Sequence, residues 1–162
     1  MSKFRVFIGY DSREEIAYKV AAYSLRKHSS IPLEITPIVQ SDLARKGIYT
    51  REKDPLSSTE FSFTRFLTPY LAEFKDWCLF VDCDFLFRKD IASILDYTDT
   101  SKAVMVVKHE YNPPEKTKMD NCVQTVYPKK NWSSCILWNA DAEECKALTP
   151  DVVNIQSGMY LH

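Results

Sequence analysis

Two aspartates separated by one cysteine directly follow a continuous apolar run of strand length. Residues 77–81 are continuously apolar, and Asp82-Cys83-Asp84 come next. Such a run predicts a strand buried on both faces, and ligands bind at the carboxyl ends of strands in open α/β sheets. Two neighbouring carboxylates repel each other and are costly to bury, so a counter-cation is expected.

Carboxylate oxygens suit Mg²⁺ or Mn²⁺, which usually also contact substrate phosphates. A metal held by Asp82 and Asp84 would act as a Lewis acid on a diphosphate leaving group. The alternative is that the two aspartates merely end a strand and cap the next turn. Apolar residues flank the motif on both sides, at 77–81 and at 85–87. The two acids therefore lack a solvated setting, and we favour the metal site.

The elements that must position this motif alternate between strand and helix, which predicts an α/β fold. Strands are expected at 5–9, 33–39, 77–81, 103–107 and 134–138, and helices at 13–27, 61–74, 90–95 and 140–148. The strand at 103–107 is expected to be buried. Asp11-Ser12 can cap the first helix, where Ile16, Val20 and Tyr23 fall at helical spacing, as does the pair Ala21-Ala22. Pro69 predicts a kink or break within 61–74, and residues 41–60 and 109–131 are irregular.

The bulk composition fits a single domain over residues 1–162. The net charge is −1, which gives no indication of a nucleic-acid partner. No apolar run reaches the length of a membrane span, and no signal peptide precedes the first strand, so we expect a cytoplasmic protein. The five cysteines are odd in number and contain no CxxC pair, which predicts reduced thiols. The half-apolar end of the chain suggests that a C-terminal part of the domain is missing.

Four segments together resemble the GT-A glycosyltransferases related to family 8, which includes glycogenin and bacterial lipopolysaccharide glycosyltransferases. They are Val6-Phe7-Ile8-Gly9-Tyr10-Asp11 with its following helix, residues 63–71 containing Phe63-Thr64-Arg65-Phe66, the Asp82-Cys83-Asp84 strand, and residues 131–139 containing Asn131-Trp132-Ser133-Ser134. The motif Asp-x-Asp alone is weakly specific, whereas the ordered set is more so.

The resemblance implies a GT-A (Rossmann-like) three-layer α/β/α fold with a mostly parallel central sheet. It also implies a retaining, metal-dependent hexosyltransferase that uses a nucleotide sugar, with UDP as the expected nucleotide and Mn²⁺ or Mg²⁺ as the cofactor. The acceptor is unknown; a glycan or lipopolysaccharide is the kind the family suggests, and a homodimer stays open.

The resemblance also assigns roles to individual residues. Asp82 and Asp84 would bind the metal, and both would take part in catalysis together with Arg65. Arg65 would reach the donor sugar or the second carboxylate, and Ser133 and Ser134 would line the donor-sugar pocket. The nucleotide would be bound by Ile8, Gly9, Tyr10, Asp11, Val81, Asp82 and Cys83.

The chain departs from the family pattern at two places. Cys135 stands where the family has glycine, and no clear counterpart exists for the family's downstream metal-binding histidine: the histidines are His28, His109 and His162. No nucleophile can be named, and Gln156 is only a candidate donor-face group. A front-face reaction needs only the metal and positioning.

Several alternatives stay open at this point. Tyr10 and Asp11 can simply form the turn and cap before the first helix, and Arg65 can serve a structural ion pair. A non-catalytic nucleotide-sugar-binding module is a second function. An aspartyl-phosphate phosphatase is a third and less favoured one, because Leu86 replaces its expected Thr or Val and a whole βαβ unit precedes the motif.

Overall fold

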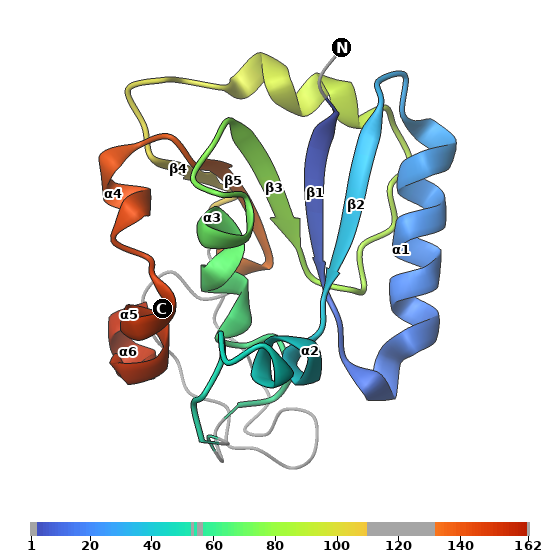
Figure 1. The fold of residues 1–162 in the computed structure, drawn as a ribbon. Helices are drawn as coiled ribbons and strands as arrows, with labels where there is room; N and C mark the ends of the chain where they lie inside the picture. Colours follow the sequence, from blue (N-terminus) through green and yellow to red (C-terminus); the bar gives the residue numbers. More distant parts are fainter. Residues whose placement is uncertain (1–2, 53, 55–56, 110–131, 162) are drawn as a thin grey trace.

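The computed structural model describes residues 3–52, 54, 57–109 and 132–161. Five strands form one sheet in the order β2-β1-β3-β5-β4 (Figure 1). They are β1 (Phe4–Gly9), β2 (Leu33–Ile38), β3 (Trp77–Val81), β4 (Val104–Val106) and β5 (Cys135–Asn139). β1 pairs in parallel with both β2 and β3, whereas β5 runs antiparallel to β3 and β4. Four strands therefore share one direction, and the predicted mostly parallel α/β sheet is confirmed.

Helices connect the strands as the alternating pattern predicts. A 3₁₀ turn, η1 (Ser12–Glu14), leads into α1 (Glu15–His28), and α2 (Gln40–Arg45) follows β2. The crossovers from β1 to β2 and from β2 to β3 move across the sheet in opposite directions, so right-handed connections place their helices on opposite faces. Figure 1 shows α3 (Thr68–Leu71) to the left of β3, towards β5, and α1 to the right of β2.

The predicted helix at 61–74 is only partly correct. The structure has a 3₁₀ helix, η2 (Thr64–Leu67), and then α3, with Pro69 in the first turn of α3. Proline is accepted there because the first backbone N–H groups of a helix have no intrahelical partner. Phe61, Phe63 and Phe66 are buried, so the large apolar residues do face the core as their spacing indicates.

Other boundaries were also shifted. The irregular stretch 41–60 contains most of α2, and the helix at 90–95 is a 3₁₀ helix, η3 (Ile91–Tyr97), capped by Asp90, whose carboxylate accepts from the amide of Ala92. The expected helix at 140–148 shortens to α4 (Glu143–Lys146), followed by α5 (Pro150–Ile155) and α6 (Gly158–Leu161). No described helix is long and apolar enough to cross a bilayer.

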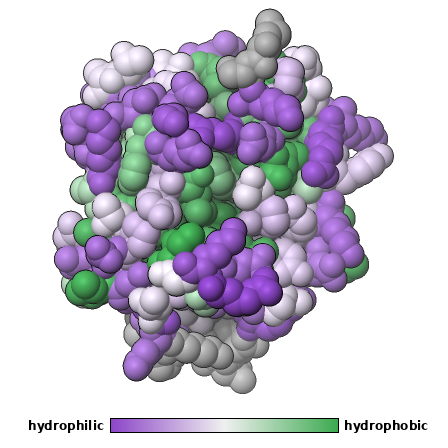
Figure 2. Space-filling view, in the orientation of Figure 1, coloured by the Kyte–Doolittle hydropathy of each residue, from purple (hydrophilic) through white to green (hydrophobic). Residues whose placement is uncertain are grey.

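The prediction of a buried strand at 103–107 is wrong about burial. β4 lies at the edge of the sheet, and Val104 is 42% exposed. Edge strands have one neighbour instead of two, so an apolar run does not by itself guarantee that both faces are covered. Figure 2 shows hydrophilic residues around the face seen in Figure 1, with apolar residues in its middle.

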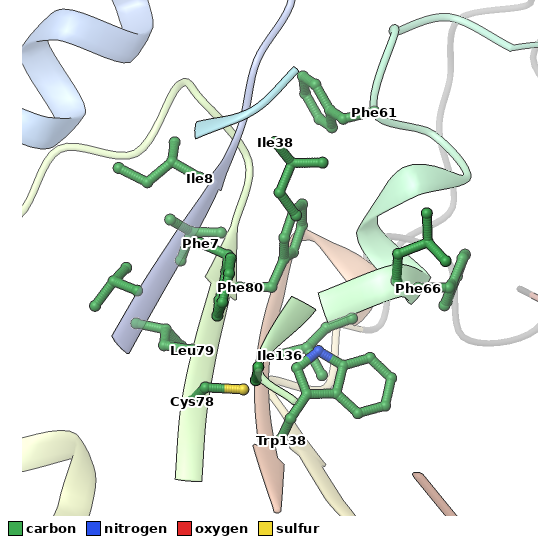
Figure 3. Packing of buried hydrophobic residues seen from close by; sticks show 14 of the residues in the cluster. Phe7, Ile8, Ile38, Phe61, Phe66, Cys78, Leu79, Phe80, Ile136 and Trp138 are labelled. Atoms are coloured by element: carbon green, nitrogen blue, oxygen red, sulfur yellow. The ribbon is translucent and has the colours of Figure 1, made fainter. Parts of the chain in front are cut away.

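The core lies on both faces of the central strands, β1 and β3. Side chains of β1, β3 and β5 pack against η2 and one another (Figure 3). All of β3 except Trp77 is fully buried, as are Val6 and Ile8 of β1. This rigid apolar centre fixes where the carboxyl ends of β1 and β3 emerge.

Candidate functional site

The first feature of the site is the strand register at its edge. Ile8 pairs with Val81, so Gly9 at the end of β1 and Asp82 directly after β3 lie at the same edge of the sheet. The amide of Asp82 donates to the carbonyl oxygen of Ser134 at 2.9 Å, just before β5 begins. Three of the four motifs therefore meet at one end of the sheet.

Arg65 joins the remaining motif to this point. Its Nη1 lies 2.9 Å from Oδ1 of Asp82 and 2.8 Å from the carbonyl oxygen of Ser133, whose Oγ is 3.3 Å away. The Arg65 side chain is 8% exposed and that of Asp82 is 22% exposed. The ion pair is made with the first carboxylate of the motif, and not with the second as the resemblance allowed.

The rings of Phe61 and Phe80 hold this guanidinium. The Arg65 Cζ atom lies 5.2 Å from the centroid of Phe61 and 5.3 Å from that of Phe80. Aromatic faces attract cations and attract a guanidinium more strongly where water is excluded. The two rings therefore add to the contacts that keep the guanidinium beside Asp82.

The surroundings of Asp82 raise the pKa of its carboxyl group. Burial raises its pKa to about 6, Arg65 opposes that rise, and the charges of Asp84 and Glu14 add to it. Asp84 itself is exposed. The edge of the sheet thus carries more negative charge than the single guanidinium balances, which is a setting that attracts cations.

Glu14 is a residue of this site that the sequence did not reveal as such. The buried thiol of Cys83 donates to its Oε2 at 3.3 Å, and burial followed by this contact raises the pKa of the thiol. In the sequence, Glu14 is an acidic residue near the start of the helix expected at 13–27. Its position directly after the first strand, at the edge where Asp82 emerges, was the signal available.

Asp11 and Gly9 are engaged by the chain itself. Asp11 is fully buried; its Oδ1 accepts from the backbone amide and Nε of Arg13, and its Oδ2 accepts from Arg13 Nη2 and from the amide of Glu60. The side-chain bond from Arg13 is the largest cause that lowers the pKa of Asp11 to about 2. A Cβ added to Gly9 would lie 2.5 Å from the ring of Phe61. Both residues hold the segment around Phe61 against the end of β1.

The remaining predicted residues lie at the same edge with different exposure. Val81 and Ile8 are buried, whereas Tyr10, Ser133 and Ser134 are partly exposed. His109 is exposed and its carbonyl oxygen accepts from the Trp132 indole at 3.3 Å. His28 ends α1, and His162 lies outside the described residues.

The predicted metal ligands at this edge, Asp82 and Asp84, supply carboxylate oxygens, which are hard ligands. Within the described ranges, no group of three or more His, Cys, Asp or Glu residues is arranged to hold a metal ion. The four cysteines in those ranges are free, as predicted, and three of them are buried; Cys122 lies outside them. Asp82 and Asp84 follow β3 as a pair of carboxylates and do not by themselves make such a group.

Comparison with known proteins supports the fold. No family model matches the sequence. The chain is 56% identical over 159 residues to Protein CDI of Arabidopsis thaliana, a match that covers 98% of this chain and 61% of CDI. The chain thus spans about 61% of the length of this curated relative.

Solved glycosyltransferase structures share the architecture at low sequence identity. The apo structure of the bifunctional glycosyltransferase WbbM superimposes with a TM-score of 0.61 at 15% identity, covering 94% of this chain and 34% of WbbM. GlyE of Streptococcus pneumoniae TIGR4 gives 0.59 at 15% identity, covering 98% and 41%. A glycosyltransferase involved in glycosylation of the major capsid of PBCV-1 gives 0.52 at 15% identity, covering 95% and 68%. The chain has a glycosyltransferase-like α/β fold.

Proposed function

We propose that this chain binds a nucleotide-sugar donor, with UDP-hexose as the expected form, at the carboxyl edge of the sheet and transfers the sugar to an acceptor. The observation that carries the proposal is the Arg65–Asp82 ion pair, because it gathers three segments distant in the sequence at one partly exposed point. Buried charges at a ligand-binding edge are typical of functional sites. The glycosyltransferase-like fold supports the same class.

A divalent cation fits the residues present. Asp82 and Asp84 supply carboxylate oxygens, and Mg²⁺ or Mn²⁺ is commonly held by one or two carboxylates with water and substrate phosphates completing the shell. When bound, such an ion would stabilise negative charge on the departing diphosphate.

The chain's own residues would prepare the site. Arg65 holds the Asp82 carboxylate in one orientation and fixes the Ser133 backbone beside it. Gly9 ends β1, the strand that pairs with β3, and the partly exposed Tyr10 follows it, so a nucleotide bound to Asp82 would extend towards Tyr10. Retention at the sugar by a front-face route would require this positioning and no protein nucleophile.

Titration calorimetry with UDP, in the presence and absence of Mn²⁺, tests the metal-dependent donor site. We expect wild-type chain to bind UDP with Mn²⁺ and to lose at least about tenfold in affinity in Asp84→Asn, which corresponds to about 1.4 kcal/mol. Asp96→Asn, another exposed aspartate, is the matched control and should bind as wild type does. Absence of Mn²⁺-dependent binding, or equal binding by Asp84→Asn, would overturn the proposal.

A non-catalytic donor-binding module is the second candidate. It is favoured by the absence of a third metal-ligating side chain among the described residues and by the 61% coverage of the curated relative. Hydrolysis or transfer from a panel of nucleotide sugars separates the two: release of UDP supports the transferase, and tight binding without turnover supports the module. Covalent trapping of a phosphate analogue on Asp82 would instead revive the phosphatase.

A further inference from the structure

Trp132 is a partly exposed aromatic residue directly beside the proposed donor site. It begins the 3₁₀ helix η5 (Trp132–Ser134), which leads into β5. The carbonyl oxygen of Ser134 accepts from the amide of Asp82 at 2.9 Å. Two residues of chain span at most about 7 Å, so the backbone of Trp132 starts within side-chain reach of the Asp82 segment.

The indole ring of Trp132 is held by the segment that follows β4. Its Nε1 donates to the carbonyl oxygen of His109 at 3.3 Å, and Nζ of Lys108 lies 5.8 Å from its ring centroid. An ammonium group covers only one face of an aromatic ring, and Trp132 remains partly exposed with Lys108 in place. The ring is therefore oriented by two neighbours and still accessible to a ligand.

Packing in the core does not account for this tryptophan. Trp138 lies within the buried core and Trp77 packs against it, whereas Trp132 belongs to neither set of described residues. A tryptophan has a large apolar body that gains from contacts which exclude water, and a polar N–H that needs a partner. Trp132 has the partner, so its remaining surface is suited to a ligand with an apolar face.

The order of the strands gives a bound donor a direction. β3 lies between β1 and β5, so Tyr10, which follows β1, and Trp132, which precedes β5, flank Asp82 on opposite sides. The bond to His109, beyond the end of β4, keeps the indole on the β5 and β4 side. A nucleotide sugar carries its base and its sugar at opposite ends of the diphosphate. With the nucleoside towards Tyr10, the sugar extends towards Trp132.

We propose that the indole ring of Trp132 stacks on the pyranose ring of the donor hexose, an assignment that rests on the proposed donor site. One face of a pyranose presents C–H groups with partial positive charge, which suit the negative face of an aromatic ring. Lys108 lies over the ring as well and helps to keep its orientation. Trp132 thus contributes affinity for the sugar and not for the nucleotide.

The affinity that the hexose adds to UDP tests this role. Calorimetry with Mn²⁺ compares UDP with UDP-glucose and UDP-galactose, and free UDP is assayed afterwards so that donor hydrolysis is not counted as binding. In the wild type, the better UDP-hexose should bind at least about threefold more tightly than UDP. In Trp132→Leu this advantage should disappear while the affinity for UDP stays unchanged. Trp132→Tyr keeps an aromatic face and should retain most of it.

Trp77→Leu is the matched control, because Trp77 is also partly exposed but lies at the amino edge of the sheet. Measured where circular dichroism shows the variant folded, it should keep the wild-type advantage of UDP-hexose over UDP. UDP binding without that advantage in the wild type, or with an equal advantage in Trp132→Leu, would overturn the role of Trp132 alone. Failure of UDP to bind would overturn the donor site and this assignment with it.

Tryptophan fluorescence gives a second readout that requires no turnover. UDP-hexose should change the emission of the wild type beyond the change caused by UDP, because the sugar covers the exposed part of Trp132. This additional change should be absent in Trp132→Phe and present in Trp77→Phe. An additional change that survives in Trp132→Phe, or none in the wild type, would contradict stacking on this ring.

Discussion

Two arginines hold opposite ends of β3 and its neighbours, and they do so in different chemical settings. At the carboxyl edge, Arg65 pairs with a carboxylate in a mostly buried, acidic site. At the amino edge, Arg5 donates to the carbonyl oxygens of Ala72 and Lys75 in the turn that leads into β3. The first arrangement keeps charge where a ligand can reach it, and the second only fixes backbone.

Among the residues that the structure describes, those other than glycine with a positive φ all lie at the amino edge. Glu73, Phe74 and Asp76 have φ values of 55°, 53° and 59°, which non-glycine residues adopt at some cost. Arg5 and a bond from the Asp76 amide to the Asp141 carboxylate at 2.7 Å hold the turn in place. The comparison predicts that changes at the carboxyl edge impair ligand binding, whereas changes at the amino edge alter stability alone.

Arg65→Leu should have the largest effect. It removes the partner of a mostly buried carboxylate, so we expect a loss of about 2 to 4 kcal/mol in the free energy of unfolding and loss of Mn²⁺-dependent UDP binding. Urea denaturation and calorimetry measure the two effects. Arg65→Lys keeps the charge and should recover stability in part; a stable, UDP-binding Arg65→Leu protein would break the comparison.

Arg5→Leu is the matching change at the other edge. The carbonyl oxygens of Ala72 and Lys75 lose their charged donor, which should cost about 1 to 3 kcal/mol of unfolding free energy. UDP binding at a temperature where the variant is folded should equal that of the wild type. Weakened binding there would show that the two edges are coupled.

Asp11→Asn tests the electrostatics of the carboxyl edge through pH. In the folded protein the pKa of Asp11 is lowered to about 2. Its ionised carboxylate therefore stabilises the fold at any pH above the pKa of the unfolded chain, and this stabilisation is lost as the pH falls through about 4 towards 2. The wild type should exceed Asp11→Asn by about 1 to 2 kcal/mol at pH 7. Urea denaturation should show this gap closing as the pH approaches 2; a gap independent of pH would contradict it.

Glu73→Gly should have the smallest effect and the opposite sign. Glycine accepts a positive φ without steric cost, so the variant should gain up to about 1 kcal/mol in unfolding free energy. The lost exposed Glu73–Lys75 ion pair offsets little of this. Thermal denaturation measures the change, and a lower midpoint than that of the wild type would indicate that the turn is not strained.

Much of the fold was predictable because its signals are local. The apolar run at 77–81 and the short run ending at Gly9 each form the expected strand, and α1 spans nearly the expected range. The errors came from segments where local pattern competes with position in the sheet. Val104 shows this: a run of apolar residues appears buried in the sequence but lies on an edge strand.

The sequence by itself determined that two aspartates leave a buried strand at the carboxyl edge of an α/β sheet, because strand burial and periodicity are written in residue types. Only the tertiary structure decided which charges meet there. Arg65 pairs with Asp82, the Cys83 thiol contacts Glu14, and Asp11 is occupied by Arg13 and Glu60. These partners lie between 2 and 69 residues apart along the chain, and the longer separations are set by strand register and helix packing, which no local pattern encodes. The same holds for α1: its periodicity predicts a helix, but the sheet decides that small alanines face inward and leaves Ile16, Val20 and Tyr23 outside.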